Sequence, residues 1–131
     1  MKKAVFDTNI LIKFFHTPGP FADLLNHYDL ILLPSVVLAE FKSGLFNTEA
    51  GEKGRLALSR IIASPGIRIV PMTEVTSDNY AKIFQILKKV GCPIPQNDIW
   101  IAASTIEHEA ELVTFDDHFK SIPDLRVIYC K

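Results

Sequence analysis

Short apolar segments of β-type residues alternate along this chain with longer segments whose apolar residues repeat at helical spacing. Parallel strands are joined by crossovers that are usually helices, so this alternation predicts an α/β fold around a parallel sheet. We expect strands at Lys3–Phe6, Leu30–Leu33, Arg68–Val70, Glu111–Thr114 and Val127–Tyr129. We expect helices at Thr8–Phe15, Phe21–His27, Ser35–Phe46, Gly54–Ala63, Val75–Val90 and Ile99–Glu109.

The composition is that of a folded protein that buries a substantial core. The chain has 131 residues, of which 48% are apolar and 22% are charged, and we expect one domain spanning residues 1–131. The net charge of −1 gives no evidence for a nucleic-acid partner. A bound divalent ion would, however, offset acidic residues locally, so the overall charge is weak evidence against an anionic substrate.

The cysteine content and the apolar segments indicate the compartment. Cys92 and Cys130 form neither a disulfide framework nor a zinc motif, which favours a reducing environment. The apolar run at the N-terminus ends at Asp7, far short of a signal peptide. The longest apolar stretch, residues 30–39, contains Pro34 and is too short to span a bilayer. We therefore expect a cytoplasmic protein that is not anchored to a membrane.

Four carboxylates occupy unusual places in this pattern, either at the end of an apolar strand or within an apolar helical segment. They are Asp7, Glu40, Asp98 and Asp116. A carboxylate beside or inside a core is unfavourable unless it is paired, hydrogen-bonded or bound to a metal ion. None of the four has a basic residue next to it in the sequence, so together they indicate a shared metal site.

The expected topology brings these carboxylates to one edge of the sheet. In open parallel sheets, ligands bind beyond the carboxyl ends of the strands at a topological switch point. Asp7 follows the first expected strand and Asp116 follows the fourth, so both project over one crevice if these strands are neighbours. Asp98 begins the helix before the fourth strand, and Glu40 lies in the helix after the second.

The donor atoms indicate the metal and the reaction. Carboxylate oxygens without a nearby thiolate or imidazole favour Mg²⁺ or Mn²⁺ over zinc. Such a site suits phosphodiester hydrolysis, because the ion activates water and polarises the phosphoryl group. Asn9, Asn97 and Thr114 each neighbour one of the carboxylates, and we expect them to orient ligands or water molecules.

Four segments that contain these residues resemble the motifs of PIN-domain ribonucleases: residues 5–11, 35–41, 94–103 and 112–119. Their order and the chain length resemble the VapC toxins of toxin–antitoxin pairs. The resemblance implies a three-layer α/β/α sandwich and a metal-dependent endonuclease that acts on RNA. It assigns the acidic cluster to Asp7, Glu40, Asp98 and Asp116, and ranks Asp117 below Asp116. Glu109 departs from the family, because many relatives have a helix-ending glycine there.

Simpler roles are open for the same residues. Asp7, Asp98 and Asp116 each precede a helical stretch, where an aspartate commonly serves as an N-cap. Glu40 has the alternative of a solvent-facing helical position. We expect His118 to be a surface or capping residue, as is usual for a histidine in a turn.

The sequence thus predicts a Mg²⁺- or Mn²⁺-dependent endoribonuclease with RNA as its substrate and a cognate antitoxin as its inhibitor. We also expect a homodimer, because the early helices carry more apolar residues than a small sheet covers: Ile10, Leu11, Phe14, Phe15 and Phe21. One alternative is a PIN-like module that binds RNA or protein without cleavage. A phosphoacceptor receiver domain is less favoured, because Asp7 has no acidic neighbour and the fifth strand is not followed by a suitable lysine.

Overall fold

The computed structural model describes residues 1–131 and contains one five-stranded parallel sheet in the order β3-β2-β1-β4-β5. The strands are β1 (Lys3–Phe6), β2 (Leu30–Pro34), β3 (Ile67–Val70), β4 (Glu111–Thr114) and β5 (Val127–Tyr129). All four strand pairs are parallel. The expected α/β class and parallel sheet are therefore confirmed.

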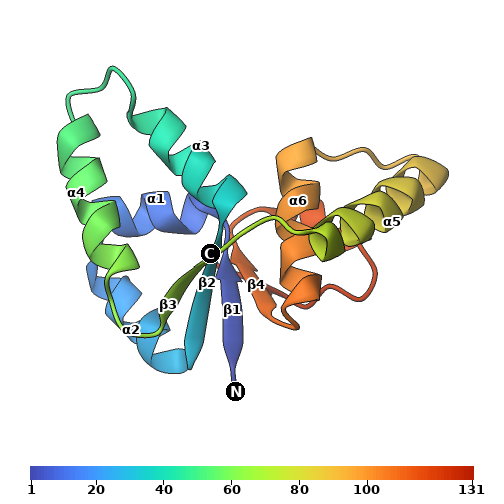
Figure 1. Cartoon of the computed structure of the whole chain (residues 1–131), viewed down its shortest axis with the longest axis horizontal. Coiled ribbons are helices and arrows are strands. Elements are labelled where there is room, and N and C mark those ends of the chain that lie inside the picture. The colour runs from blue at the N-terminus through green and yellow to red at the C-terminus, as the bar shows by residue number, and fades with distance from the viewer.

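Helices cover both faces of this sheet (Figure 1). One side carries α1 (Thr8–His16), α2 (Gly19–His27), α3 (Ser35–Leu45) and α4 (Gly51–Ile62), and the other carries α5 (Glu74–Val90) and α6 (Gln96–Glu107). The chain steps from β1 through β2 to β3, then returns past β1 to β4. Since crossovers are right-handed, the reversal of direction moves the connecting helices to the opposite face. The result is the expected three-layer α/β/α sandwich.

The core is built on the two central strands and the helices next to them. Ala4, Val5 and Phe6 of β1 are fully buried, as are Leu112 and Val113 of β4. Both strands lie between helical layers, so their apolar residues run continuously instead of alternating with polar ones. None of the helices combines the length and the apolar character that crossing a membrane requires.

The apolar residues of the early helices belong to this core. Ile10, Leu11 and Phe14 are buried, while Phe15 and Phe21 are half-buried and pack against the core. The ring of Phe14 lies 4.8 Å from that of Phe21, measured between centroids. The expectation that these side chains remain as uncovered surface for a homodimer is therefore wrong, because the helices fold them onto the sheet and onto one another.

Two helices begin three residues earlier than the sequence predicts. α6 begins at Gln96, directly after Pro95, instead of at Ile99. α4 begins at Gly51 instead of Gly54. A β-carbon at Gly51 would lie 2.6 Å from the carbonyl oxygen of Leu45, so glycine is required by close packing against the end of α3 and does not interrupt the helix.

The end of α6 explains how the chain accommodates Glu109 at the position where the family resemblance led us to expect a glycine. Glu109 adopts a φ of 51°, in the left-handed region that L-residues rarely occupy. The Ala110 nitrogen donates to the carbonyl of Thr105, and the Glu109 nitrogen donates to that of Ile106, both at 3.1 Å. These bonds close the helix as a glycine-ended terminus does, with a glutamate in the strained position.

Candidate active site

The candidate site lies where the sheet changes its direction of winding, at the carboxyl ends of β1 and β4. These two strands are neighbours, with Phe6 paired to Val113. The pairing continues one residue further, because the Asp7 nitrogen donates to the carbonyl of Val113 at 3.0 Å. Asp7 therefore emerges next to the start of the loop that carries Asp116, at the switch point where α/β proteins bind ligands.

Asp7 is held on both of its carboxylate oxygens, and only 5% of the residue is exposed. Oδ1 accepts a 2.7 Å hydrogen bond from the Thr8 nitrogen, which makes Asp7 the N-cap of α1. Oδ2 accepts a 2.7 Å bond from Thr114 Oγ1 and a longer one, 3.4 Å, from Asn9 Nδ2. The capping role foreseen as an alternative is therefore present, but it involves only Oδ1, while Thr114 and Asn9 hold Oδ2.

The pKa of Asp7 is raised, chiefly because burial disfavours the charged form. The hydrogen bonds from Thr114 and Thr8 oppose this rise, and the negative charges of Asp98 and Glu40 add to it. No lysine or arginine pairs with Asp7. A buried carboxylate with a raised pKa and no cationic partner is the kind of group that marks a functional site.

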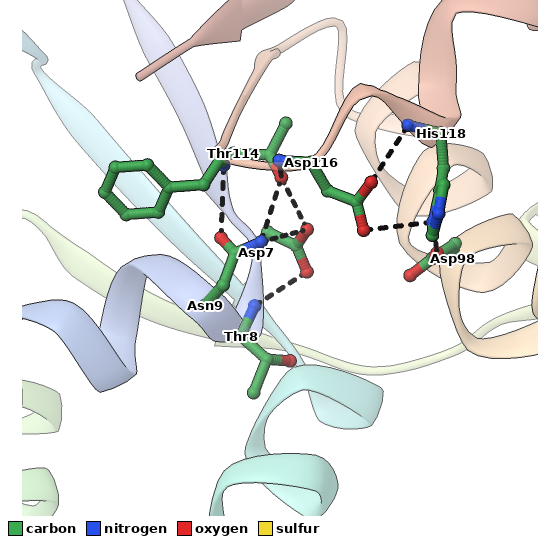
Figure 2. Close-up of polar contacts among 8 residues, drawn as sticks. Asp7, Thr8, Asn9, Asp98, Thr114, Asp116 and His118 are labelled. Carbon is green, nitrogen blue, oxygen red and sulfur yellow. Dashed lines mark hydrogen bonds and ion pairs between the residues drawn. The ribbon is translucent and has the colours of Figure 1, made fainter. Parts of the chain in front are cut away.

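Thr114 joins the two strand ends through one hydroxyl group (Figure 2). Its Oγ1 donates a hydrogen bond to Asp7 and accepts two, one from the Asp116 nitrogen at 3.0 Å and one from Asn9 Nδ2 at 3.3 Å. Asn9 also accepts the Phe115 nitrogen on its Oδ1 at 3.3 Å. Asn9 and Thr114 therefore lie where residues that orient the carboxylates would be needed.

Asp98 and Asp116 meet around the imidazole of His118 (Figure 2). The Nδ1 atom of His118 lies 3.3 Å from Asp98 Oδ2 and 3.0 Å from Asp116 Oδ2. One ligand atom from each of these three residues lies within 4.8 Å of the others, a spacing at which they could hold a metal ion. The other oxygen of Asp116, Oδ1, caps the 3₁₀-helix Asp117–Ser121 through the His118 nitrogen at 3.0 Å.

Electrostatic effects couple these groups. Burial raises the pKa of Asp98; the hydrogen bond and positive charge of His118 lower it, while the charges of Asp116 and Glu40 raise it. The pKa of His118 is raised, chiefly by its hydrogen bond to Asp98; burial opposes this rise, and the charges of Asp116, Asp98 and Asp117 add to it. His118 is at the surface, as expected, with its side chain 49% exposed, but its ring also contacts both carboxylates, which the sequence did not indicate.

Glu40 reaches the same region from α3. It is half-buried, and its Oε1 accepts a 3.0 Å hydrogen bond from Thr8 Oγ1. Its charge raises the pKa of both Asp7 and Asp98, so it lies near these carboxylates while part of its side chain remains exposed to solvent. This hydrogen bond from Thr8 was not predicted from the sequence, although the position of Thr8 next to Asp7 was a signal that it lies at the site.

Asn97 and Asp117 do not join the cluster. Asn97 is exposed and makes no side-chain hydrogen bond, so its expected role in orienting a ligand has no structural support. The reason is helical geometry: α6 begins at Gln96, and neighbouring residues on a helix point about 100° apart. Asp117 is exposed and lies 3.6 Å from Lys120 Nζ.

The donor set fits a divalent cation. Apart from the contacts of His118, none of the four carboxylates forms an ion pair. Closely spaced carboxylates without a fixed cation repel one another, and a hard divalent ion relieves this repulsion while binding their oxygens. The site therefore has both the ligand atoms and the uncompensated negative charge that such an ion requires.

Comparisons with known proteins agree with this geometry. A sequence model described as "PIN domain" matches residues 4–125. Ribonuclease VapC1 of Haemophilus influenzae (strain R2866) is 28% identical over 127 residues, which are 93% of each chain. Ribonuclease VapC4 of Mycobacterium tuberculosis (strain ATCC 25618 / H37Rv) is 27% identical over 93 residues, 71% of this chain and 72% of the relative.

Solved structures share the whole fold. The crystal structure of VapBC2 from Rickettsia felis, bound to a DNA fragment from its promoter, matches 97% of this chain and 98% of that chain, with 26% identity and a TM-score of 0.86. These matches confirm the resemblance to VapC-type ribonucleases and decide against a receiver domain. Because the family model spans nearly the entire chain and includes all four carboxylates, the chain belongs to the PIN-domain family.

Proposed function

We propose that this protein is a metal-dependent endoribonuclease that hydrolyses RNA phosphodiester bonds, and that it is the toxin of a type II toxin–antitoxin pair. The observation that carries the proposal is the close approach of Asp98 and Asp116 around His118, with the buried Asp7 and the half-buried Glu40 near enough for their charges to act on this group, and without a lysine or arginine to neutralise them. Membership of the PIN-domain family and the names of the ribonuclease relatives support the same activity.

The residues that would hold the ion are Asp7, Asp98 and Asp116, with Glu40 close enough for its charge to act on two of them. Their oxygen donors favour Mg²⁺ or Mn²⁺. When bound, such an ion supplies Lewis-acid polarisation of the phosphoryl group and activation of water.

The protein's own side chains prepare this site. Thr114 and the Thr8 backbone fix the Asp7 carboxylate in one orientation, and Asn9 braces Thr114. Thr8 also holds Glu40 through its hydroxyl. His118 keeps Asp98 and Asp116 within reach of a common ligand. Fixed ligands of this kind lower the reorganisation that binding and catalysis require.

The titles of related structures describe VapBC complexes, from Rickettsia felis and from nontypeable Haemophilus influenzae among others. By analogy we assign this chain a protein antitoxin, which would block the acidic site, with an arginine or lysine as the natural counter-charge. We further assign it to the cytoplasm as one nuclease domain spanning residues 1–131, acting as a homodimer. The early-helix residues offer little surface for such a dimer, since Ile10, Leu11 and Phe14 are buried and Phe15 and Phe21 pack against the core.

Cleavage of total RNA by the purified protein tests the activity. We expect cleavage with added Mg²⁺ or Mn²⁺, none in excess EDTA, and recovery when metal is restored. Asp98→Asn should abolish cleavage, whereas Asp124→Asn should not, because Asp124 is exposed and lies between the 3₁₀-helix Asp117–Ser121 and β5, away from the cluster. RNA that is bound by the metal-loaded protein but never cut would favour the alternative of a binding module without cleavage.

A further inference from the structure

We propose that a hollow beside the acidic cluster, lined by Lys13, His16, Phe115 and Lys131, holds the single-stranded RNA next to the bond that is cut. The hollow has a volume of about 510 Å³. Its remaining lining residues are Asn9, Ile12 and Thr17. This inference rests on the proposed ribonuclease function and assigns to it a place where the substrate lies.

The hollow adjoins the acidic cluster through two of its lining residues, Asn9 and Phe115. Asn9 lines it and also bonds to Asp7 and Thr114 on the cluster side. Phe115, another lining residue, stands between Thr114 and Asp116 in the sequence, and its backbone nitrogen is bonded to Asn9. A nucleotide in the hollow would therefore be directly beside a phosphate held at the carboxylates.

The charge of the hollow is opposite to that of the cluster. Lys13, His16 and Lys131 are exposed, and no aspartate or glutamate is among the lining residues. Neither lysine is in an ion pair, so both ammonium groups are free to meet phosphates. The acidic cluster repels an RNA strand except where a cation intervenes, and adjacent lysines provide the attraction that its phosphates need.

Phe115 supplies the other element of a single-strand site. The three residues before it, Leu112, Val113 and Thr114, are fully buried, yet Phe115 is 38% exposed at the edge of the hollow. Bases of single-stranded RNA stack on exposed aromatic rings irrespective of their sequence, while nearby basic groups follow the backbone. An aromatic ring and two unpaired lysines around one hollow match this mode of binding.

Binding of a fluorescently labelled single-stranded RNA, followed by anisotropy in an uncleaving Asp98→Asn background, tests the proposal. Phe115→Ala should weaken binding by roughly 5- to 100-fold, and Phe115→Tyr should restore it, since stacking contributes about that much per base. Lys13→Ala should weaken binding and reduce the slope of log K against log salt by about 0.7, the value for one phosphate contact on a single strand. Lys89→Ala removes the same charge at the far end of α5 (Figure 1) and should change neither quantity.

The controls separate this proposal from the function on which it rests. Lys13 and Phe115 are exposed, and circular dichroism of each variant verifies that the fold is retained. If the parent chain cleaves RNA while Lys13→Ala and Phe115→Ala bind as tightly as the background, the hollow is not the RNA site and the proposal is overturned alone. If the parent chain neither binds nor cleaves RNA, the ribonuclease function fails and the proposal fails with it.

Discussion

The hydroxyl of Thr114 donates a 2.7 Å hydrogen bond to Oδ2 of Asp7, and so connects the end of β4 to the carboxylate that follows β1. The Thr114 Oγ1 atom also accepts hydrogen bonds from the backbone nitrogen of Asp116 and from the side-chain amide of Asn9. A hydroxyl offers one donor and two acceptor sites, and Thr114 uses all three. The relative position of Asp7 and Asp116 is thereby fixed through one fully buried side chain.

Thr114→Val should lower RNA cleavage by roughly 10- to 100-fold, the usual loss when a residue that orients metal ligands is removed. The substitution preserves the shape of the side chain but removes its hydrogen bond to Asp7. Because this bond lowers the pKa of Asp7, the pKa should rise further in the variant. Cleavage measured against metal concentration should show weaker binding of the ion. Thr105→Val is the matched control, because the Thr105 hydroxyl is also buried but bonds to Ile101 of its own helix. Equal metal dependence in the two variants would contradict the orienting role of Thr114.

Asp7→Asn should raise the thermal stability of the metal-free protein near neutral pH. Burial raises the pKa of Asp7 in the folded state. Protonation of Asp7 therefore adds to the stability of the fold at a pH below the pKa of the unfolded chain, and this contribution is lost as the pH rises through the pKa of the folded state. The gain from the substitution should therefore be largest at about pH 8 and shrink toward pH 4. Unfolding followed in EDTA measures it, with roughly 3–5 °C expected per kcal/mol in a domain of this size.

The control for this measurement is Asp23→Asn, which alters an exposed carboxylate in α2. It should leave the melting temperature nearly unchanged at every pH. Excess Mg²⁺ should stabilise the parent chain more than the Asp7→Asn variant. An ion stabilises the fold to the extent that it binds the folded state, and the variant lacks one of its ligands. A variant at Asp7 that is destabilised at pH 8 and gains stability on acidification would reverse the expected sign.

His118→Ala should move the acidic limb of the cleavage–pH profile toward higher pH. The hydrogen bond and charge of His118 lower the pKa of Asp98, so without them Asp98 takes up a proton at higher pH and no longer serves as an ionised ligand. The measurement is kcat/KM on a defined RNA across the acidic range. His27→Ala, at the end of α2, should leave the profile where it is. An unshifted limb in His118→Ala would show that His118 does not act on Asp98.

Glu109→Gly should stabilise the protein by up to about 1 kcal/mol without changing cleavage. A left-handed conformation is unfavourable for an L-residue by roughly 1–2 kcal/mol, and glycine loses part of this advantage through its greater freedom when unfolded. The Glu109 carbonyl, which accepts a 3.0 Å bond from Arg126 Nη2, is retained. Glu109→Ala keeps the unfavourable φ and should give no gain in denaturant unfolding. Equal stability of the two variants would contradict the claim that the backbone is strained at this position.

The sheet was predictable because each strand is a short apolar segment that can be recognised from its own residues. The order of strand-like and helical segments fixes a parallel sheet, and carboxylates at strand ends mark its functional edge. Helix starts were less predictable, since a glycine reads locally as a break. At Gly51 and Gly54 the glycines serve close packing against Leu45, which depends on the tertiary arrangement of α3 and α4.

The site was predictable to the extent that its residues belong to motifs. The contacts of His118 depend on how α6 approaches the loop after β4, and neither the spacing nor the composition of the sequence specifies that approach. The same holds for the hollow that contains Lys13 and Phe115, residues far apart in the chain. Asn97 shows the converse, because its proximity in sequence to Asp98 does not mean that the two side chains share a helix face, and Asn97 is exposed.

The measurement that tests the central claim most directly is the metal dependence of cleavage of one defined single-stranded RNA by the parent chain and by Asp7→Asn. We expect the parent rate to rise with Mn²⁺ or Mg²⁺ and to vanish in EDTA. The Asp7→Asn rate should be more than about 100-fold lower at every metal concentration, since a ligand matters at least as much as the residues that orient it. Undiminished cleavage by folded Asp7→Asn in excess EDTA would contradict a metal-dependent reaction at this acidic cluster.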